Sequence, residues 1–119
     1  MTIQERHRLK GTLNISGDKS ISHRAIILGA LSIGETKIYN LLESKDILST
    51  IKILRCLGIS IKKESNCWVV SGNGSGGFKQ PRAALNAGNS GTTSRLLYGA
   101  VATNPIYCTF IGDHSLSTR

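Results

Sequence analysis

Three basic side chains near the start of an apolar run have the types and the spacing to bind an anion. Lys19 and Arg24 flank Ser20, and His23 directly precedes Arg24. If residues 20–31 form a helix, Arg24 lies one turn after Ser20 on the same face, beside backbone N–H groups that carry about half a positive charge. An ammonium, a guanidinium, a hydroxyl and free N–H groups together suit a phosphate or a carboxylate.

A simpler interpretation of the same charges stays open. Cations at a helix start are unfavourable, because the helix dipole is already positive there. Asp18 can neutralise one of them without any ligand. The two interpretations differ in whether an external anion or Asp18 balances the cluster.

A turn and a buried helix are expected to position this cluster. Residues 17–18 predict a turn, and Ser20 is the predicted N-cap of a helix over residues 20–31. From Ala25 onward this run has no charged side chain, so its body is predicted to be buried, with only the first turn reaching solvent or a ligand. Gly34 can adopt the left-handed conformation that ends such a helix.

A second Gly-polar turn follows the same plan. Residues 88–95 place hydroxyls and an arginine before another apolar helical run, with Ser90 or Thr92 as its cap. Gly91 would let a ligand approach the main chain, because it has no Cβ. A third Gly-polar-Arg stretch occupies residues 112–119.

The chain also repeats itself at an offset of 71 positions. The offset pairs Gly17 with Gly88 and Arg24 with Arg95, and it superposes apparent strands. Few residues are identical, but the order of strand, turn, helix and strand recurs. We interpret this as an internal duplication whose second copy is incomplete.

The remaining pattern alternates strands and helices. Strands are predicted at residues 9–16, 36–42, 59–63, 67–71, 83–87 and 106–111, and a second helix runs through Ile47, Ile51, Leu54 and Leu57 to a stop at Gly58. The predicted fold class is α/β (α+β), built from repeated βαβαββ units. Residues 1–16 form a leading strand, residues 17–80 the first unit, and residues 81–119 the start of a second unit.

Two familiar phosphate-binding loops are excluded. Residues 72–77 match the pattern G-x-G-x-x-G, but they lead into Pro81 and not into the helix that the dinucleotide motif requires, so we predict a flexible connector. A P-loop also fails, because Asp18 stands where that motif has a glycine before Lys19.

Composition limits the partners and the setting. The chain has 119 residues, enough for one domain, and its 15 basic and 7 acidic side chains give a net charge of +8, which favours anionic partners. No apolar run is long enough to span a bilayer and residues 1–6 lack a secretory core, so a cytoplasmic location is expected. The three cysteines, Cys56, Cys67 and Cys108, have neither disulfide nor zinc spacing and are predicted to be buried packing residues, with no metal site.

Four separated motifs resemble one enzyme family. They lie at residues 19–24, 41–46, 89–92 and 112–119. Together, and in this order, they resemble the 5-enolpyruvylshikimate-3-phosphate (EPSP) synthases of the shikimate pathway, and the likeness runs over the whole chain. The Ser-His-Arg form of the first motif and the Gly-Asp-x-Ser-Leu form of the last are similar to bacterial variants grouped as class II.

The resemblance implies a two-domain enzyme made of repeated βαβαββ units, in which residues 1–16 can belong to the other domain. Such an enzyme transfers the enolpyruvyl group of phosphoenolpyruvate to shikimate 3-phosphate and releases phosphate, in chorismate and aromatic amino-acid biosynthesis. It uses no metal and no organic cofactor. The expected partners are these two small molecules, with neither nucleic acid nor membrane, and the intact enzyme is expected to be a monomer.

The first motif supplies the residues that the resemblance assigns to shikimate 3-phosphate. Lys19 would contact both substrates, and Ser20 and Arg24 would hold shikimate 3-phosphate. Lys19 is also the one catalytic candidate in this chain, with a mainly electrostatic part.

The later motifs supply the residues that the resemblance assigns to phosphoenolpyruvate. Gly91 and Arg119 would bind it, and Asn89 and Thr92 would shape the same loop. Because Gly91 leaves room beside the substrate, the intact enzyme is expected to be sensitive to glyphosate.

The chain matches only an early part of the family's length. In the family a proline and the rest of the enzyme follow the position of Arg119, so this chain is expected to be a fragment. The family's acid–base carboxylates and a further lysine come later in the sequence. We therefore expect no turnover from the 119 residues alone.

Other functions remain open at this point. The UDP-N-acetylglucosamine enolpyruvyl transferases share the fold, but they have Asn-Ala after the lysine, where this chain has Ser20 and, downstream, Arg24. A non-catalytic basic module that binds anions or nucleic acid fits the charge of +8 equally well. A remnant that folds without catalysing anything is the third alternative.

Overall fold

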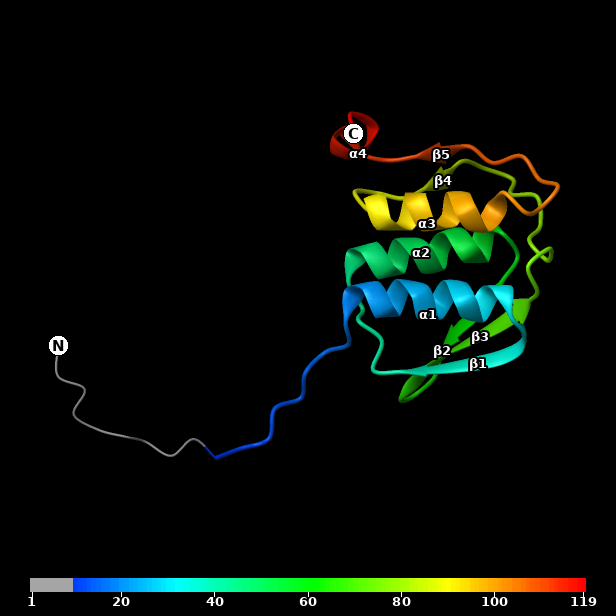
Figure 1. Ribbon diagram of the computed structural model, residues 1–119. Helices are drawn as coiled ribbons and strands as arrows, with labels where there is room; N and C mark the ends of the chain where they lie inside the picture. Colours follow the sequence, from blue (N-terminus) through cyan, green and yellow to red (C-terminus); the bar gives the residue numbers. More distant parts are fainter. Residues whose placement is uncertain (1–9) are drawn as a thin grey trace, which may run out of the picture.

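Three parallel helices form the centre of the protein in a computed structural model, which describes residues 10–119 (Figure 1). These helices are α1 (Lys19–Leu31), α2 (Lys45–Cys56) and α3 (Gly91–Val101), and a short helix α4 (His114–Ser117) follows near the end of the chain. Each long helix contacts the other two. All three begin at the same end of the molecule, where α4 also lies (Figure 1).

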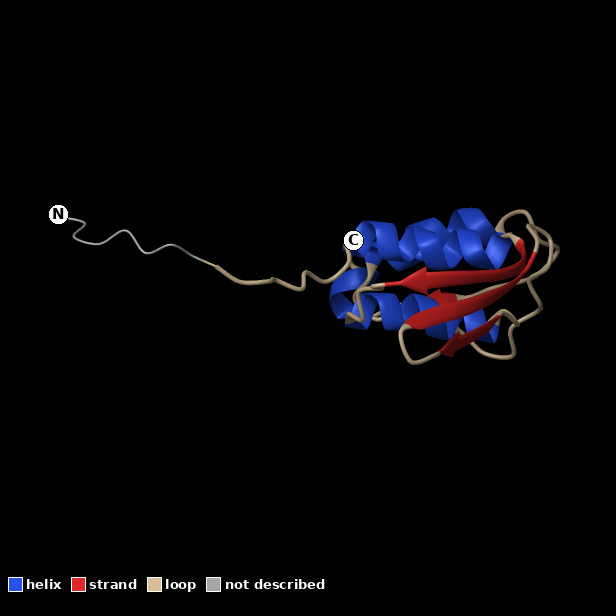
Figure 2. Cartoon of the chain, turned by 90° about the horizontal axis from the view of Figure 1, so that it is seen from below, coloured by secondary structure: helices blue, strands red, loops and turns tan. Residues whose placement is uncertain are grey.

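A three-stranded antiparallel sheet covers α1 and α2 on one side. It contains β1 (Ile33–Tyr39), β2 (Ser60–Lys63) and β3 (Cys67–Asn73) in the order β1-β3-β2. Ile33 pairs with Asn73, and Ser60 pairs with Ser71. Figure 2 shows these strands lying across the helices. Two further strands, β4 (Leu85–Asn86) and β5 (Phe110–Ile111), pair in parallel as a second sheet, and β4 contacts α2.

Helix α2 forms where the 3.6-residue spacing of apolar residues predicts it. Ile47, Ile51 and Leu54 are buried, while the opposite face carries polar side chains. Ser44 caps the helix by accepting a hydrogen bond from the Ile47 N–H at 3.4 Å. Gly58 ends it with φ of 87°, a left-handed conformation that a residue with a Cβ adopts only with strain.

The apolar core joins all of these elements. Its fully buried side chains come from α1, α2, α3, β3 and β4, and the largest include Ile26, Ile51, Val70, Leu85 and Leu97. The antiparallel β2–β3 hairpin adds Ile61 and Trp68. The mixture of helices and strands confirms the predicted fold class.

The cap of α1 differs from the prediction. Asp18, not Ser20, occupies the N-cap position, and its carboxylate accepts the Ile21 N–H at 2.8 Å. A carboxylate there is favourable because it also opposes the positive end of the helix dipole. Ser20 lies inside the first turn with an exposed side chain.

The burial of α1 is also less complete than predicted. Ile26, Ile27 and Ala30 are buried, but Leu28 is 64% exposed. The sheet, α2 and α3 cover only part of the helix surface. Leu28 instead lines an apolar groove between α1 and α3.

The predicted strand at residues 9–16 is wrong within the described part of the chain. Leu9 lies outside the described residues, and residues 10–16 form no strand and are exposed. A side-chain hydrogen bond connects them to the rest of the protein, from Asn40 Nδ2 to the Ile15 carbonyl at 3.2 Å. A strand needs a neighbour to pair with, and residues 10–16 pair with none of the described strands. The strands predicted at 83–87 and 106–111 exist but shrink to β4 and β5.

The glycine-rich stretch at residues 72–77 is partly regular structure. Its first two residues belong to β3, and a Cβ on Gly72 would collide with the carbonyl oxygens of Gly29 and Ser32. The glycine therefore allows β3 to pack tightly against the end of α1, which corrects the prediction of a flexible connector at this position. No helix follows this stretch before α3, so the exclusion of a dinucleotide loop is confirmed.

The cysteines are free, but they are not all buried. Cys67 is buried in β3, Cys56 is exposed on α2, and Cys108 is half-buried just before β5. Residues 10–119 contain no cluster of His, Cys, Asp and Glu side chains that could hold a metal ion. Within the same residues, no helix is long and apolar enough to cross a membrane.

Candidate functional site

A pocket of about 420 Å³ opens at the end of the molecule where the three long helices begin. The N-terminal turns of α1 and α3, α2 and the segment around α4 contribute its walls. Its lining residues are Lys19, Asp46, Asn89, Gly91, Thr92, Ser94, Arg95, Tyr98, Leu116 and Arg119. Free N–H groups of helix starts therefore surround the same space as three cationic side chains.

Lys19 is held in place by a partner that sequence reasoning did not identify. Its ammonium forms an ion pair with Asp46 Oδ2 at 2.8 Å. Asp46 is in the first turn of α2, where a carboxylate is favourable. Asp18, the predicted neutralising group, caps α1 instead, so Asp46 balances the charge of Lys19.

Arg119 reaches the pocket from the chain end. Its Nη2 donates to Asn89 Oδ1 and to Ser115 Oγ, each at 3.1 Å. Asn89 in turn donates from Nδ2 to Asp113 Oδ2 at 2.6 Å. Asn89 thus holds both ends of the α4 segment against the turn that precedes α3.

Asp113 has a pKa below its usual value. The hydrogen bond from Asn89 is the largest cause that lowers its pKa below 3.8, and the Leu116 N–H at 2.8 Å adds to it. The carboxylate also caps α4. Its carboxylate therefore accepts hydrogen bonds from within the loop, and Asp113 does not line the pocket.

Gly91 is the first residue of α3 and faces Arg119. Ser90 caps the helix, as predicted, by accepting the Thr93 N–H at 3.1 Å. A Cβ on Gly91 would lie 3.4 Å from Arg119 Nη1 and 3.8 Å from Leu116 Cδ1. The missing side chain leaves open space directly beside a guanidinium, and Thr92 lines the same wall.

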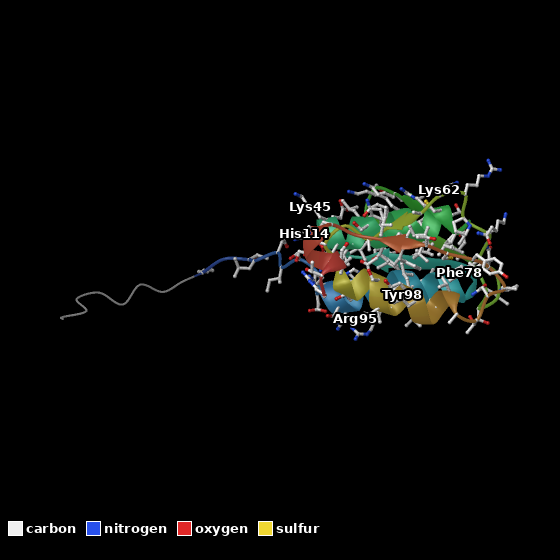
Figure 3. All side chains as sticks on the ribbon, turned by 90° about the horizontal axis from the view of Figure 1, so that it is seen from above. Lys45, Lys62, Phe78, Arg95, Tyr98 and His114 are labelled. Carbon is white, nitrogen blue, oxygen red and sulfur yellow. The ribbon has the colours of Figure 1, made fainter. Side chains whose placement is uncertain are left out.

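Arg95 and Tyr98 complete the wall on α3. Figure 3 shows Arg95 toward the same end of the molecule as Lys45 and His114, with Tyr98 further along the helix. The Tyr98 ring is 50% exposed and meets Phe110 edge-on, with ring centroids 4.7 Å apart. The sequence signal for Arg95 was its pairing with Arg24 in the internal repeat, whereas nothing in the sequence singled out Tyr98.

Five of the seven predicted site residues line this pocket, namely Lys19, Asn89, Gly91, Thr92 and Arg119. Ser20 and Arg24 do not line it. Both are exposed, and Arg24 Nη1 donates to the Ser20 carbonyl at 3.2 Å. Arg24 instead borders the apolar groove between α1 and α3, so the predicted convergence of Lys19, Ser20 and Arg24 on one pocket is not observed.

The charges that line the pocket favour an anion with several negative groups. Lys19, Arg95 and Arg119 contribute cations, and Asp46 contributes the only carboxylate in the pocket wall formed by the described residues. The pocket therefore keeps a positive excess after the Lys19–Asp46 pair is formed. Phosphate and carboxylate groups are the ligands that helix N-termini, Lys and Arg bind best.

Comparisons with known proteins show the family of this chain. Residues 3–119 match the family model of EPSP synthase (3-phosphoshikimate 1-carboxyvinyltransferase). Relatives named 3-phosphoshikimate 1-carboxyvinyltransferase include those of Novosphingobium aromaticivorans, 54% identical, and of a Bradyrhizobium species, 55% identical, each over 112 residues that cover 93% of this chain and 25% of the relative.

A solved structure shares the same arrangement of elements. EPSP synthase from Acinetobacter baumannii superposes with a TM-score of 0.86 at 40% identity, over 92% of this chain and 25% of that one. The chain thus spans about a quarter of the length of the relatives that it matches. With the family model matched from residue 3 to residue 119, the chain belongs to the EPSP synthase family.

Proposed function

We propose that this chain forms the phosphoenolpyruvate-binding part of a cytoplasmic 3-phosphoshikimate 1-carboxyvinyltransferase. The reaction joins the enolpyruvyl group of phosphoenolpyruvate to shikimate 3-phosphate and releases phosphate. One observation carries the proposal: Lys19, Gly91 and Arg119, which are far apart in the sequence, line a single cationic pocket. The family to which this chain belongs supports the choice of substrate.

The side chains have separable parts in this proposal. Arg119, steadied by Asn89 and Ser115, presents its guanidinium to the carboxylate or the phosphate of phosphoenolpyruvate. Lys19, steadied by Asp46, stabilises negative charge that develops as phosphate leaves. Gly91 keeps the space beside Arg119 open for the ligand.

Shikimate 3-phosphate is the proposed second substrate, and Ser20 and Arg24 are its proposed contacts. Both side chains are exposed, next to the pocket residue Lys19 in the chain, and Arg24 carries a guanidinium suited to a phosphate. Their separation from the pocket fits a second ligand better than a shared one. The proposed enzyme is a monomer.

Binding to the 119-residue protein tests the first part of the proposal. In an NMR titration, phosphoenolpyruvate should shift the amide signals of Gly91 and Thr92 and the guanidinium signal of Arg119. Lys19→Met should weaken binding roughly 10- to 100-fold, as expected when a hydrogen bond to a charged group is lost. Lys52→Met is the matched control, because Lys52 is exposed on α2 and does not line the pocket. Equal losses in both variants would contradict the proposal.

Turnover tests the second part. The 119 residues alone should release no phosphate from the two substrates. A chimera in which this chain replaces the matching 112 residues of the Novosphingobium relative should release phosphate with shikimate 3-phosphate as the acceptor. Equal activity with UDP-N-acetylglucosamine would favour the alternative transferase.

A further inference from the structure

A row of hydrogen-bonded, buried polar side chains crosses the three-helix layer. His23 on α1 is fully buried, and its Nδ1 lies 2.9 Å from Thr50 Oγ1 on α2. Thr50 Oγ1 lies 2.8 Å from Thr93 Oγ1 on α3. Both threonines are also fully buried, so three helices are connected by hydrogen bonds inside an otherwise apolar core.

This row of hydrogen bonds ends at the turn that borders the pocket. Thr93 Oγ1 lies 2.7 Å from the hydroxyl of Ser90, the N-cap of α3. Thr93 is also 3.3 Å from the carbonyl oxygen of Asp46, whose side chain holds Lys19. Gly91 lies between Ser90, the cap, and Thr93 in the first turn of α3. The hydrogen bonds that begin at His23 thus reach residues on both sides of Gly91.

We propose that His23 is a positioning residue for the Ser90–Gly91 turn and acts through the hydroxyl groups of Thr50 and Thr93. The part of this proposal that concerns ligand affinity rests on the proposed function, since it takes the pocket to bind phosphoenolpyruvate. The part that concerns the position of the turn does not. His23 does not line the pocket, so it acts only through its neighbours.

Hydrogen-bond directions explain why the charge of His23 matters to the turn. Each threonine hydroxyl has one proton to donate. Thr93 donates its proton to Ser90 Oγ, so it accepts from Thr50, and Thr50 in turn accepts from the Nδ1–H of a neutral His23 ring. A charged ring keeps this direction and adds a proton on Nε2. Protonation therefore acts on the cap of α3 by displacing the ring from Thr50, and not by reversing the hydroxyls.

A charged ring is also unfavourable at this position. His23 Nε2 is buried and has no hydrogen-bond partner among the described residues. Burial is the largest effect on the pKa of His23 and lowers it below 6.5. The charged groups that face the ring are Asp46 from α2, which raises the pKa, and Lys19 and Arg24 from α1, which lower it. From α3 the ring is linked to the uncharged Thr93 and Ser90.

A ligand-free NMR experiment on the 119-residue protein tests the positioning. The Gly91 and Thr92 amide signals should shift with the same pH midpoint as the His23 ring. In Thr93→Val, which keeps the side-chain shape but removes the hydroxyl, His23 should still titrate while the Gly91 signal no longer follows it. Thr103→Val is the matched control at the other end of α3, where the hydroxyl contacts Ser75 and Ala100. The proposal is wrong if Gly91 does not follow His23 in the wild type, or follows it equally in Thr93→Val.

Affinity for phosphoenolpyruvate gives the second readout. Thr93→Val and His23→Leu should weaken binding roughly three- to tenfold, as expected for one lost hydrogen bond. His23→Asn should restore it to near wild type, because the Asn amide replaces Nδ1 and leaves out Nε2. An Asn variant as weak as the Leu variant would overturn the proposal. If the wild type binds no phosphoenolpyruvate, the proposed function fails, and the pH coupling of Gly91 still decides the role of His23.

Discussion

At the scale of single residues, the site depends on side chains that hold other side chains. Arg119 is oriented by Asn89, and Lys19 is oriented by Asp46. These two cations thus have a neutral or an acidic partner before any ligand binds, which reduces the entropy lost on binding. Gly91 contributes by the absence of a side chain beside Arg119.

Replacing Gly91 with alanine should weaken phosphoenolpyruvate binding by about 1–3 kcal/mol, the usual range for overpacking. The added methyl group would lie 3.4 Å from Arg119 Nη1, inside the space that the ligand is proposed to occupy. Calorimetric titration measures the change. Gly99→Ala is the control on the same helix, because a Cβ there meets nothing within 4 Å. Equal affinities of Gly91→Ala and the wild type would refute the steric argument. Equal glyphosate inhibition curves for the chimera with Gly91 and the chimera with Gly91→Ala would refute it as well.

At the scale of elements, the N-termini of the helices decide the position of the site. α1, α2 and α3 begin with the side chains of Asp18, Ser44 and Ser90 accepting backbone N–H groups. All three starts lie at one end of the molecule (Figure 1). Their dipoles add to the charges of the pocket cations, so an anion is most favourable there.

The cap of α1 can be tested directly. Asp18→Ala should lower the free energy of unfolding by about 1 kcal/mol, because the Ile21 N–H loses its partner. Ser20→Ala should leave stability almost unchanged, since the side chain of Ser20 caps nothing. Urea unfolding of both variants measures the difference. A larger loss of unfolding free energy in Ser20→Ala than in Asp18→Ala would identify Ser20 as the cap, as the sequence predicts.

At the scale of the whole molecule, one titrating side chain links the helix layer. His23 contacts Thr50 and, through it, Thr93, so its protonation acts on α1, α2 and α3 together. Its pKa is lowered in the folded protein, mainly by burial. Between that lowered value and 6.5, the unfolded chain therefore binds more protons than the folded one.

The free energy of unfolding should consequently fall as the pH decreases below 6.5, and the His23 contribution should be fully present above that value. Thermal unfolding across this pH range measures the slope. His23→Asn should remove the slope that His23 causes, and His114→Asn should leave it, because His114 is exposed on α4. A slope that survives in His23→Asn would assign the pH dependence to other groups.

Local patterns determined several features of this protein without its structure. The apolar spacing of α2, the strands β2 and β3, a capped helix start at Ser90 or Thr92 and the cationic start of α1 depend on neighbouring residues, whose contacts lie within a few positions in the chain. The motifs that indicated the family are equally local. Of the seven site residues that they predicted, five line the pocket, and Ser20 and Arg24 do not.

Tertiary structure alone decided which distant groups meet. Asp46 balances Lys19 across 27 positions, and Thr93 reaches Thr50 across 43, because parallel packing brings the helices together. The same packing leaves Leu28 exposed and keeps Arg24 outside the pocket, although their sequence context suggested otherwise. Periodicity shows that a helix has a buried face, but the number and position of its neighbours decide how wide that face is.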